Sequence, residues 1–302
     1  MQRFISPVIL SYYSLNTAKT ISQEEIEQTL INFSKENTNL RKAYLNNDQF
    51  SYYLAGLLEG DGHISLPAVG KTTLNRILNP RIVFTSHINN FGLYSYIQSE
   101  LGGIGRFQLT GTNTLRYIIG DIKGIKLFIN LIHGKLRTPK NKRFNDLIKF
   151  INIKYSAFLP FLCNKKDDKK DEIPESLLDT SDFRNNSWFT GFTDSDGYFG
   201  VKIVESKPKS ETRKRSVSEN ISLRFRLDQR SFDIPTSSSM LPVMETLATF
   251  LSCKLSTYVI KAGSGSKEVL SLSVTSIDKL EFIVNYFNKY PLLGVKGNDF
   301  KH

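Results

Sequence analysis

The chain has 302 residues, with 40 Lys plus Arg against 29 Asp plus Glu, and a formal net charge of +11. Hydrophobic residues make up 40% and aromatic residues 12%, a composition that favours one large or two smaller folded domains over a disordered chain. No apolar run approaches the roughly 18 residues needed to cross a bilayer, so we expect a soluble protein without a membrane partner. The basic charge favours a polyanionic partner, with nucleic acid and an acidic membrane surface as the two candidates.

Two other classes of site are disfavoured by the composition. Cys163 and Cys253 are too few and too far apart for a zinc site or a disulfide framework, and the four histidines form no cluster with ligand spacing. The glycine cluster Gly102–Gly105 is weak, and no phosphate-binding loop is present, so a nucleotide-binding enzyme is not expected. The chain is rich in Asn, Ile, Lys, Phe and Tyr, whose codons are A+T-rich, and this bias favours a mitochondrial genome.

The predicted elements begin with an N-terminal extension, residues 1–45, with a helix around Ser22–Lys35. A first subdomain, residues 46–155, follows with one long helix that ends near Asp61. Its remaining elements are, in order, strands near His63–Leu66 and Arg81–Thr85, a helix over Asn90–Leu101, strands over Gly105–Leu109 and Leu115–Ile119, and a helix over Ile125–His133.

A linker, residues 156–186, is rich in Lys, Asp, Glu and Ser and is expected to be solvated. The second subdomain, residues 187–302, repeats the order of the first but lacks the long helix that follows Lys140. Its strands are predicted near Tyr198–Val204, Ile221–Leu227, Ser256–Lys261 and Val269–Thr275.

An internal duplication underlies this order. Tyr53–Ile64 reappears as Trp188–Phe199, each with an apolar start, a small-Gly pair, an acidic residue, a small residue and then Asp-Gly. Three further matches follow in the same order: Ile82–Ser86 with Phe225–Gln229, Asp121–Ile129 with Ser276–Val284, and Leu136–Phe144 with Leu293–Phe300. The sequence therefore predicts an α+β fold of two pseudo-symmetric αββαββα subdomains.

Small residues recur four apart in both repeated helices, at Gly56 and Gly60 and again at Gly191 and Ser195. Residues at this spacing share a helix face, and small side chains there let two helix backbones approach closely. We expect the two helices to pack against each other along these faces.

Asp61 and Asp196 end the two helices and are expected to lie side by side. Carboxylates at a helix C-terminus repel each other unless a strong counter-charge is present, and Mg²⁺ prefers oxygen ligands of this kind. A single Asp-Gly pair would indicate only a turn that ends a helix; two matched copies favour a metal site.

Leu54–Gly62 (Leu-Ala-Gly-Leu-Leu-Glu-Gly-Asp-Gly) resembles the LAGLIDADG motif of the homing endonuclease family, in its two-repeat, single-chain form found in organellar introns. Phe189–Gly197 resembles the motif more loosely at its start but keeps Gly191, Asp194 and Asp196. The resemblance covers residues 46–302. It implies a four-stranded antiparallel sheet in each subdomain, the two sheets forming a saddle in the major groove of DNA.

The resemblance also implies a metal centre. Asp61 and Asp196 would bind two or three divalent cations, Mg²⁺ by expectation, together with Gly60 and Ser195. Glu59 and Asp194, two residues earlier in each motif, are expected to have structural or electrostatic roles.

Three further catalytic residues are implied. Lys140 and Lys296 match a basic position of the family and would stabilise phosphate charge or orient the attacking water; the alternative is an ordinary surface lysine. Gln229 matches a polar position that holds the water network, and Ser86 departs from the pattern in the first half.

The function implied is metal-dependent cleavage of a long asymmetric DNA target by a monomer, with a staggered double-strand break and short 3′ overhangs. The basic loop Lys207–Arg215 is expected to grip phosphates or to be mobile. Polar residues that alternate along the strands are candidates to read base edges: Ser65, Lys71, Arg81, Arg106, Gln108, Arg116, Lys202, Ser206, Ser222, Arg224, Arg226, Tyr258, Ser271 and Ser273.

Two alternatives stay open on the same fold. Some proteins of this family assist splicing, so an intron RNA maturase, with intron RNA as its partner, is one of them. A non-catalytic DNA-binding protein is the other, and the presence of both Asp61 and Asp196 argues against it.

Overall fold

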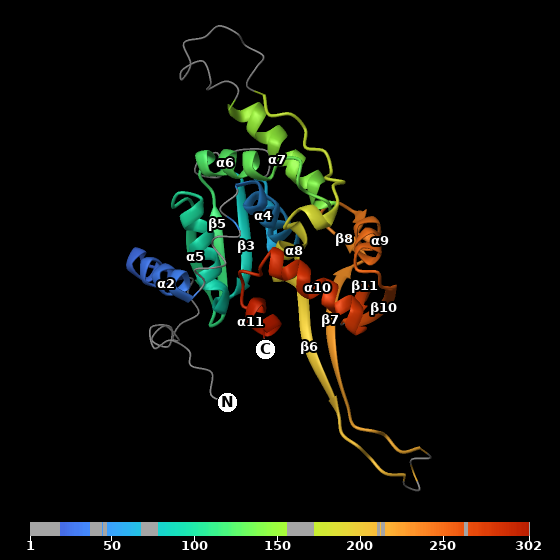
Figure 1. Cartoon of the computed structure of the whole chain (residues 1–302). Coiled ribbons are helices and arrows are strands. Elements are labelled where there is room, and N and C mark those ends of the chain that lie inside the picture. The colour runs from blue at the N-terminus through green and yellow to red at the C-terminus, as the bar shows by residue number, and fades with distance from the viewer. Residues whose placement is uncertain are drawn as a thin grey trace. The chain divides into compact units, whose positions relative to one another are not determined.

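A computed structural model of the chain describes residues 19–36, 44, 47–67, 78–155, 172–209, 212, 215–262 and 265–301. The chain forms two compact units: Met1–Arg41 with Asp61–Leu131, and Lys42–Gly60 with Ile132–His302. Both units combine helices with an antiparallel sheet (Figure 1). No described helix is both long enough and apolar enough to span a membrane.

The first unit contains a sheet in the order β1-β4-β5-β3-β2, in which every pair of neighbours is antiparallel. Helix α2 packs against α5. The strands are β1 (Lys19–Thr20), β2 (Gly62–Ser65), β3 (Arg81–His87), β4 (Arg106–Thr110) and β5 (Thr114–Ile119); the helices are α2 (Gln23–Glu36), η1 (Ile88–Asn90), α5 (Phe91–Glu100) and α6 (Ile122–Ile132).

Alternation along β3 gives this sheet one packed face and one accessible face. Ile82 and Phe84 are fully buried, whereas Arg81 and Thr85 are exposed. Aromatic side chains dominate the packed face: the Phe84 ring lies 5.7 Å from that of Tyr94 and 6.2 Å from that of Tyr117. Such large side chains supply much of the hydrophobic stabilisation of a small unit.

The second unit contains a sheet in the order β10-β11-β7-β6, also antiparallel throughout. Its strands are β6 (Gly197–Val204), β7 (Asn220–Arg230), β10 (Leu255–Ala262) and β11 (Gly265–Val274), with a short hairpin of β8 (Phe232–Asp233) and β9 (Ser238–Ser239). Its helices are α4 (Asn47–Asp61), α7 (Lys140–Tyr155), η3 (Phe183–Asn185), α8 (Trp188–Asp196), α9 (Leu241–Phe250), α10 (Ile277–Lys289) and α11 (Lys296–Lys301). The last residue of α4, Asp61, belongs to the first unit.

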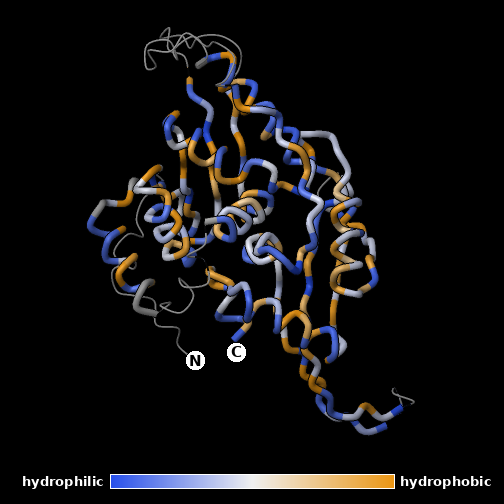
Figure 2. Tube along the Cα trace, turned by 45° about the horizontal axis from the view of Figure 1, so that its top comes forward, coloured by the Kyte–Doolittle hydropathy of each residue, from blue (hydrophilic) through white to orange (hydrophobic). Residues whose placement is uncertain are grey.

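The β6–β7 hairpin has two chemically different faces. Phe199 and Phe225 are register partners on the packed face, with ring centroids 5.4 Å apart. Farther along the hairpin this face keeps four exposed aliphatic side chains: Val201, Ile203, Ile221 and Leu223. Figure 2 shows hydrophobic positions along this part of the chain. Polar side chains such as Lys202 therefore fall on the opposite face.

Helices α4 and α8 approach closely at two glycines. A Cβ atom added to Gly56 would lie 2.0 Å from the carbonyl oxygen of Trp188, and one added to Gly191 would lie 2.0 Å from that of Tyr53. Both distances are far below van der Waals contact, so neither position has room for a side chain. The predicted packing along small residues is confirmed.

The predicted fold class is confirmed, because both sheets place their strands in the same order and follow a motif helix. Two details differ from the sequence prediction. The first sheet gains a fifth strand, β1, from the N-terminal extension. Strand β7 is longer than predicted because its ladder with β11 continues to the pair of Arg230 and Val269, and β11 begins earlier than predicted because its ladder with β10 continues to the pair of Gly265 and Ala262.

The part of the predicted linker that the structure describes, residues 172–186, is mostly exposed, but a few of its residues are buried within the second unit. Ser176 is 1% exposed and receives hydrogen bonds from Asn141 and Asn145 of α7 at its carbonyl oxygen, both at 2.9 Å. Asp179 forms an ion pair with Arg137 at 2.5 Å, and both side chains are buried. Polar residues can be buried when each finds a partner, which composition alone does not indicate.

Candidate functional site

The two motif helices end as the Asp-Gly pairs predict. Helix α8 ends at Asp196 and Gly197 opens β6; helix α4 ends at Asp61 and Gly62 opens β2. In both units the glycine pairs with a buried strand residue, Gly62 with Phe84 and Gly197 with Leu227. Each aspartate therefore lies at the junction between a motif helix and the first strand that follows it, Asp61 before β2 and Asp196 before β6.

The two aspartates have different hydrogen-bond donors. In the second unit Gln229 Nε2 donates to Asp196 Oδ2 at 2.8 Å. Gln229 lies two residues beyond Leu227, and Ser86 lies two residues beyond Phe84, so the registers make Ser86 its counterpart. The Ser86 hydroxyl instead donates to the His87 carbonyl at 3.3 Å.

In the first unit the donor to the aspartate comes from a helix. The hydroxyl of Tyr94, on α5, donates to Asp61 Oδ2 at 3.4 Å. Sequence reasoning missed Tyr94, since it lies 33 positions from Asp61 and belongs to no repeated motif. Where Gln229 has Ser86 as its counterpart, the aspartate thus receives its hydrogen bond from Tyr94 on α5 instead of from the strand.

Glu59 is the buried acceptor of the first motif. It is 4% exposed, and its carboxylate accepts hydrogen bonds from the amides of Arg137 and Thr138, from the Thr138 hydroxyl, and from Trp188 Nε1 at 2.6 Å. Burial raises the pKa of Glu59, and these donors act against that shift. The carboxylate joins α4, α8 and the segment before α7.

Asp194 plays the equivalent part in the second motif. It is 3% exposed, and Oδ2 accepts from the Tyr53 hydroxyl at 2.8 Å and from the amides of Leu293 and Gly294 at 2.8 and 3.1 Å. Its Oδ1 is buried and has no hydrogen-bond partner among the described residues. Burial raises the pKa of Asp194. The predicted structural role of these two residues agrees with this geometry.

The two matched lysines each contact the end of a motif helix. Lys140 Nζ donates to the carbonyl oxygens of Leu58, Glu59 and Gly60 at 2.9, 2.8 and 3.4 Å. Lys296 Nζ donates to the carbonyl oxygen of Ser195. A cation here satisfies terminal carbonyls and offsets the negative end of the helix dipole.

Gly60 and Ser195 meet across the helix pair. A Cβ atom on Gly60 would lie 2.2 Å from Ser195 Cβ and 2.9 Å from Asp196 Oδ2. Within the described residues no three His, Cys, Asp or Glu side chains gather into a metal cluster. Backbone carbonyls, water or an external ligand would have to complete any coordination shell at the aspartates.

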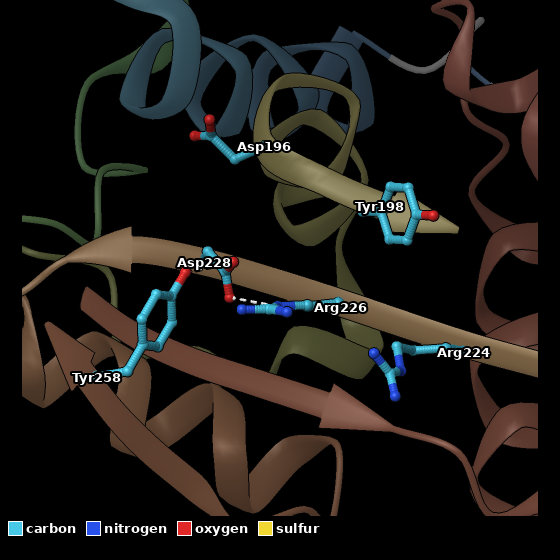
Figure 3. A pocket seen from close by; sticks show the side chains of 6 residues that line it. All are labelled: Asp196, Tyr198, Arg224, Arg226, Asp228 and Tyr258. Carbon is cyan, nitrogen blue, oxygen red and sulfur yellow. Dashed lines mark hydrogen bonds and ion pairs between the residues drawn. The ribbon is translucent and has the colours of Figure 1, made fainter. Parts of the chain in front are cut away.

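A pocket with a volume of about 510 Å³ lies beside Asp196 in the second unit. Figure 3 shows Asp196 at the end of its helix, with Arg224, Arg226 and Asp228 projecting from the neighbouring strand β7. Tyr198 of β6 and Tyr258 of β10 complete the lining. A helix-terminal carboxylate and two guanidinium groups thus share one accessible hollow. Sequence reasoning did not single out Tyr198 or Asp228.

The registers gather the predicted base-reading residues on one face of each sheet. In the first unit these are Ser65, Arg81, Arg106, Gln108 and Arg116. In the second unit they are Lys202, Ser222, Arg224, Arg226, Tyr258, Ser271 and Ser273. Ser271 is only 4% exposed, and Ser206 lies just beyond β6 in an exposed position.

Two predictions fall on parts of the chain that are not described. Lys71 lies outside the described residues, and so do four positions of the loop Lys207–Arg215. Lys207, at the start of that loop, forms an isolated antiparallel bridge with Val217, two residues beyond its end.

The chain is similar in sequence to a known protein family and to several individual proteins. The family model described as LAGLIDADG endonuclease matches residues 54–151 and 189–302. The "Intron-encoded DNA endonuclease aI3" of Saccharomyces cerevisiae is 28% identical over 265 residues, covering 85% of this chain and 62% of that protein. The "Uncharacterized cox1 intron-2 37.2 kDa protein" of Schizosaccharomyces pombe is 26% identical over 254 residues, covering 83% of this chain and 63% of that protein.

The chain therefore spans a little under two thirds of the length of these relatives. Among solved structures, the meganuclease I-SmaMI bound to uncleaveable DNA matches with a TM-score of 0.57 and 19% identity. That match covers 83% of this chain and 88% of the other, and it supports the fold. The family model covers both repeats, including both motif helices, and on this ground the chain belongs to the LAGLIDADG endonuclease family.

Proposed function

We propose that the protein is a homing endonuclease that recognises a long asymmetric DNA duplex and cuts both strands in a divalent-cation-dependent reaction. The observation that carries this proposal is the pocket in which Asp196 opens onto Arg224 and Arg226. Carboxylates favour a metal ion, and guanidinium groups favour phosphates and base edges. The neighbouring meganuclease structure is described as bound to DNA, which supports the same class of partner.

Asp61 and Asp196 would hold the cations, and their donor chemistry fits this role. Each is a carboxylate at a helix C-terminus, where the helix dipole adds attraction for a cation. Mg²⁺ retains several waters and takes few protein carboxylates, so at each aspartate water and DNA phosphate oxygens can complete the coordination shell. A bound divalent cation would activate water and offset the charge that develops on the phosphate.

Gly60 and Ser195, which directly precede Asp61 and Asp196, would each contribute a carbonyl oxygen as a further cation ligand. Each carbonyl already accepts a hydrogen bond from a lysine ammonium. Because a carbonyl oxygen has two lone pairs, it can accept this bond and still face a cation. Lys140 and Lys296 would thereby lie close enough to stabilise phosphate charge.

The proposed product is a staggered break with short 3′ overhangs, made by one strand cut in each half of a monomer. The different donors at Asp61 and Asp196 support two similar but non-equivalent centres. The unlike residues on the two accessible sheet faces support an asymmetric target. The related proteins from fungal introns, one of them in cox1, support a mitochondrial gene and site of action.

Cleavage of a randomised duplex library in Mg²⁺ tests the proposal, with wild type compared with Asp61→Asn and Asp196→Asn. We expect wild type to cut a defined subset of duplexes, and each variant to bind that subset without cutting both strands. Asp278→Asn, an exposed carboxylate at the start of α10, is the matched control and should cut normally.

Three other results would contradict parts of the proposal. If wild type leaves every duplex intact, the endonuclease function fails. If the aspartate variants cut as well as wild type, the assignment of the metal ligands fails. Selective binding of intron RNA, with no cut DNA, would favour the maturase alternative.

A further inference from the structure

Three polar side chains on the accessible face of the second sheet, those of Arg226, Tyr258 and Ser271, converge on Asp228. Arg226 and Asp228 lie two apart on β7, so they share a face. Asp228 pairs with Ser271 across β7 and β11, and Tyr258 comes from β10, two strands from β7 in the sheet. Three strands therefore contribute to one cluster beside Asp196, as Figure 3 shows in part.

The contacts within the cluster are short and all directed at one carboxylate. Arg226 Nε donates to Asp228 Oδ1 at 2.9 Å, the Ser271 hydroxyl donates to the same oxygen at 2.6 Å, and the Tyr258 hydroxyl donates to Oδ2 at 2.9 Å. The Arg226 guanidinium also lies 5.4 Å from the centre of the Tyr258 ring. Asp228 is thus fixed by two hydroxyls and in turn fixes the arginine.

The electrostatics favour a charged Asp228. Partial burial acts to raise the pKa of Asp228, but the hydrogen bonds from Arg226, Ser271 and Tyr258 outweigh it and the net shift is downward. Both partners of the ion pair remain 34% exposed, so the pair is accessible to a ligand in the pocket. Hydrogen bonds therefore fix the side chains of Arg226 and Asp228, and both remain accessible to solvent.

The geometry determines which part of Arg226 can meet a ligand. Because Nε donates to Asp228, the two terminal nitrogens are the donors that remain for recognition. Two parallel N–H groups match the O6 and N7 acceptors of guanine in the major groove. An arginine whose torsions are already fixed loses less conformational entropy when it binds.

Arg224 can be compared with Arg226, because both arginines line the same pocket. Arg224 lies two residues earlier on the same face, but it forms no ion pair with any described residue. An arginine without a fixed orientation suits phosphates, which attract a charge without demanding one base-specific geometry.

We propose that Asp228 is a positioning residue that sets Arg226 to read a guanine at one base pair of the target, with Tyr258 and Ser271 as its supports. This inference rests on the proposed DNA-binding function of the same face.

The test is a binding selection from a randomised duplex library in Ca²⁺, followed by sequencing, with wild type, Arg226→Ala, Asp228→Asn and Arg224→Ala. We expect Arg226→Ala to lower the preference for guanine at one base pair by about ten- to hundredfold. Asp228→Asn keeps the size of the side chain and should lower the preference at the same base pair by about three- to tenfold. Arg224→Ala should weaken all sequences alike and lower the salt dependence of binding.

Two further measurements separate positioning from a general structural effect. In the Asp228→Asn background, Arg226→Ala should cause much less additional loss at that base pair than it causes in wild type. Tyr258→Phe, which removes one donor without changing charge, should give a smaller loss at the same position. Thermal unfolding of each variant identifies any that fail to fold.

The outcomes distinguish this inference from the proposed function. If wild type selects no sequence, both fail. If wild type selects a target but Asp228→Asn keeps the full preference at every position, only the role of Asp228 fails. A uniform loss of affinity with Arg226→Ala, without a change in any base preference, would make Arg226 a phosphate contact and overturn the inference.

Discussion

Gly56 and Gly191 approach each other's helices reciprocally, because a Cβ atom on either one would lie 2.0 Å from a carbonyl oxygen of the opposite helix. The same contact brings Gly60 against Ser195 one turn later. The sequence duplication is thereby converted into a helix pair whose spacing depends on the absence of side chains. The same spacing therefore determines where the ends of α4 and α8 lie, and these ends carry Asp61 and Asp196.

Alanine at Gly191 should destabilise the protein. Alanine normally favours a helix over glycine, so the effect of overpacking must exceed that gain. We expect Gly191→Ala to lower the free energy of unfolding by about 1–3 kcal/mol, measured by urea denaturation. Thr246→Ala, on an exposed position of α9, is the control and should change it by less than about 0.5 kcal/mol. Equal stability of Gly191→Ala and wild type would contradict the close approach.

Asp194 should make stability depend on pH. Because burial raises its pKa above 3.8, the folded state holds the proton more tightly than the unfolded state. The contribution of Asp194 to the free energy of unfolding is fully present below about pH 3.8 and is lost as the pH rises through the raised pKa of Asp194. Asp194→Asn keeps an oxygen for the donors and removes the titration. Its free energy of unfolding, minus that of wild type, should therefore increase with pH across this window.

Asp182 is a control with the opposite sign. The amide of Arg184 is the main cause that lowers the pKa of Asp182, so its contribution is present above pH 3.8 and is lost as the pH falls through the lowered pKa. The difference in free energy of unfolding between wild type and Asp182→Asn should thus be constant above about pH 3.8 and shrink only at the acidic end of a urea-unfolding series. Parallel pH profiles for wild type and Asp194→Asn would refute the prediction for Asp194.

Gln229 and Tyr94 should affect the two strands of the substrate differently. The bond from Gln229 to Asp196 is 2.8 Å long and that from Tyr94 to Asp61 is 3.4 Å. Loss of a residue that orients a metal ligand typically costs 10- to 100-fold in activity, so we expect Gln229→Leu to slow one cut by about that factor. Tyr94→Phe should slow the other cut less.

A supercoiled plasmid that carries the selected target provides the measurement. With Gln229→Leu the nicked circle should accumulate before the linear product forms. Labelling of each strand identifies which cut is slow, and the two variants should delay opposite strands. If both variants slow both strands equally, the two centres are not independent.

Sequence periodicity and repetition were sufficient for the fold but not for the side-chain network. Gly56 and Gly191 were predictable because close helix packing requires small residues at a spacing of four, and the duplication showed them twice. Arg224 and Arg226 were predictable because alternation along a strand sorts residues by face. Asp228 continues that alternation, so the same rule could have found it.

Tyr94 and Trp188 illustrate what sequence reasoning missed. Tyr94 contacts Asp61 from a helix that no repeated motif includes, and Trp188 donates to Glu59 across the helix pair at 2.6 Å. Both contacts depend on three-dimensional packing between distant segments. Aromatic residues on a predicted helix are most often core, and nothing in the pattern indicates that their polar atoms face a carboxylate.

Lys140 should contribute both to stability and to the proposed catalysis. Its ammonium donates to carbonyls of Leu58 and Glu59 at 2.9 and 2.8 Å, at the end of α4. Lys140→Met should therefore lower the free energy of unfolding by about 1–3 kcal/mol, because it leaves these carbonyls without a charged donor. Lys142→Met is the control: this exposed lysine donates to the Ser238 hydroxyl, and its loss should cost less than about 0.5 kcal/mol.

The rate of cleavage by fully folded Lys140→Met separates the two contributions. If the lysine also stabilises phosphate charge, the folded variant should cut one strand at least tenfold more slowly than Lys142→Met, because an ammonium near the reacting phosphate has no substitute in methionine. Normal cleavage by a destabilised variant would leave Lys140 with the structural role alone. Slow cleavage with unchanged stability would instead mean that its contacts with the helix carbonyls contribute little. Lys296→Met should show the same pair of effects on the other strand, because Lys296 donates to the Ser195 carbonyl at the end of α8.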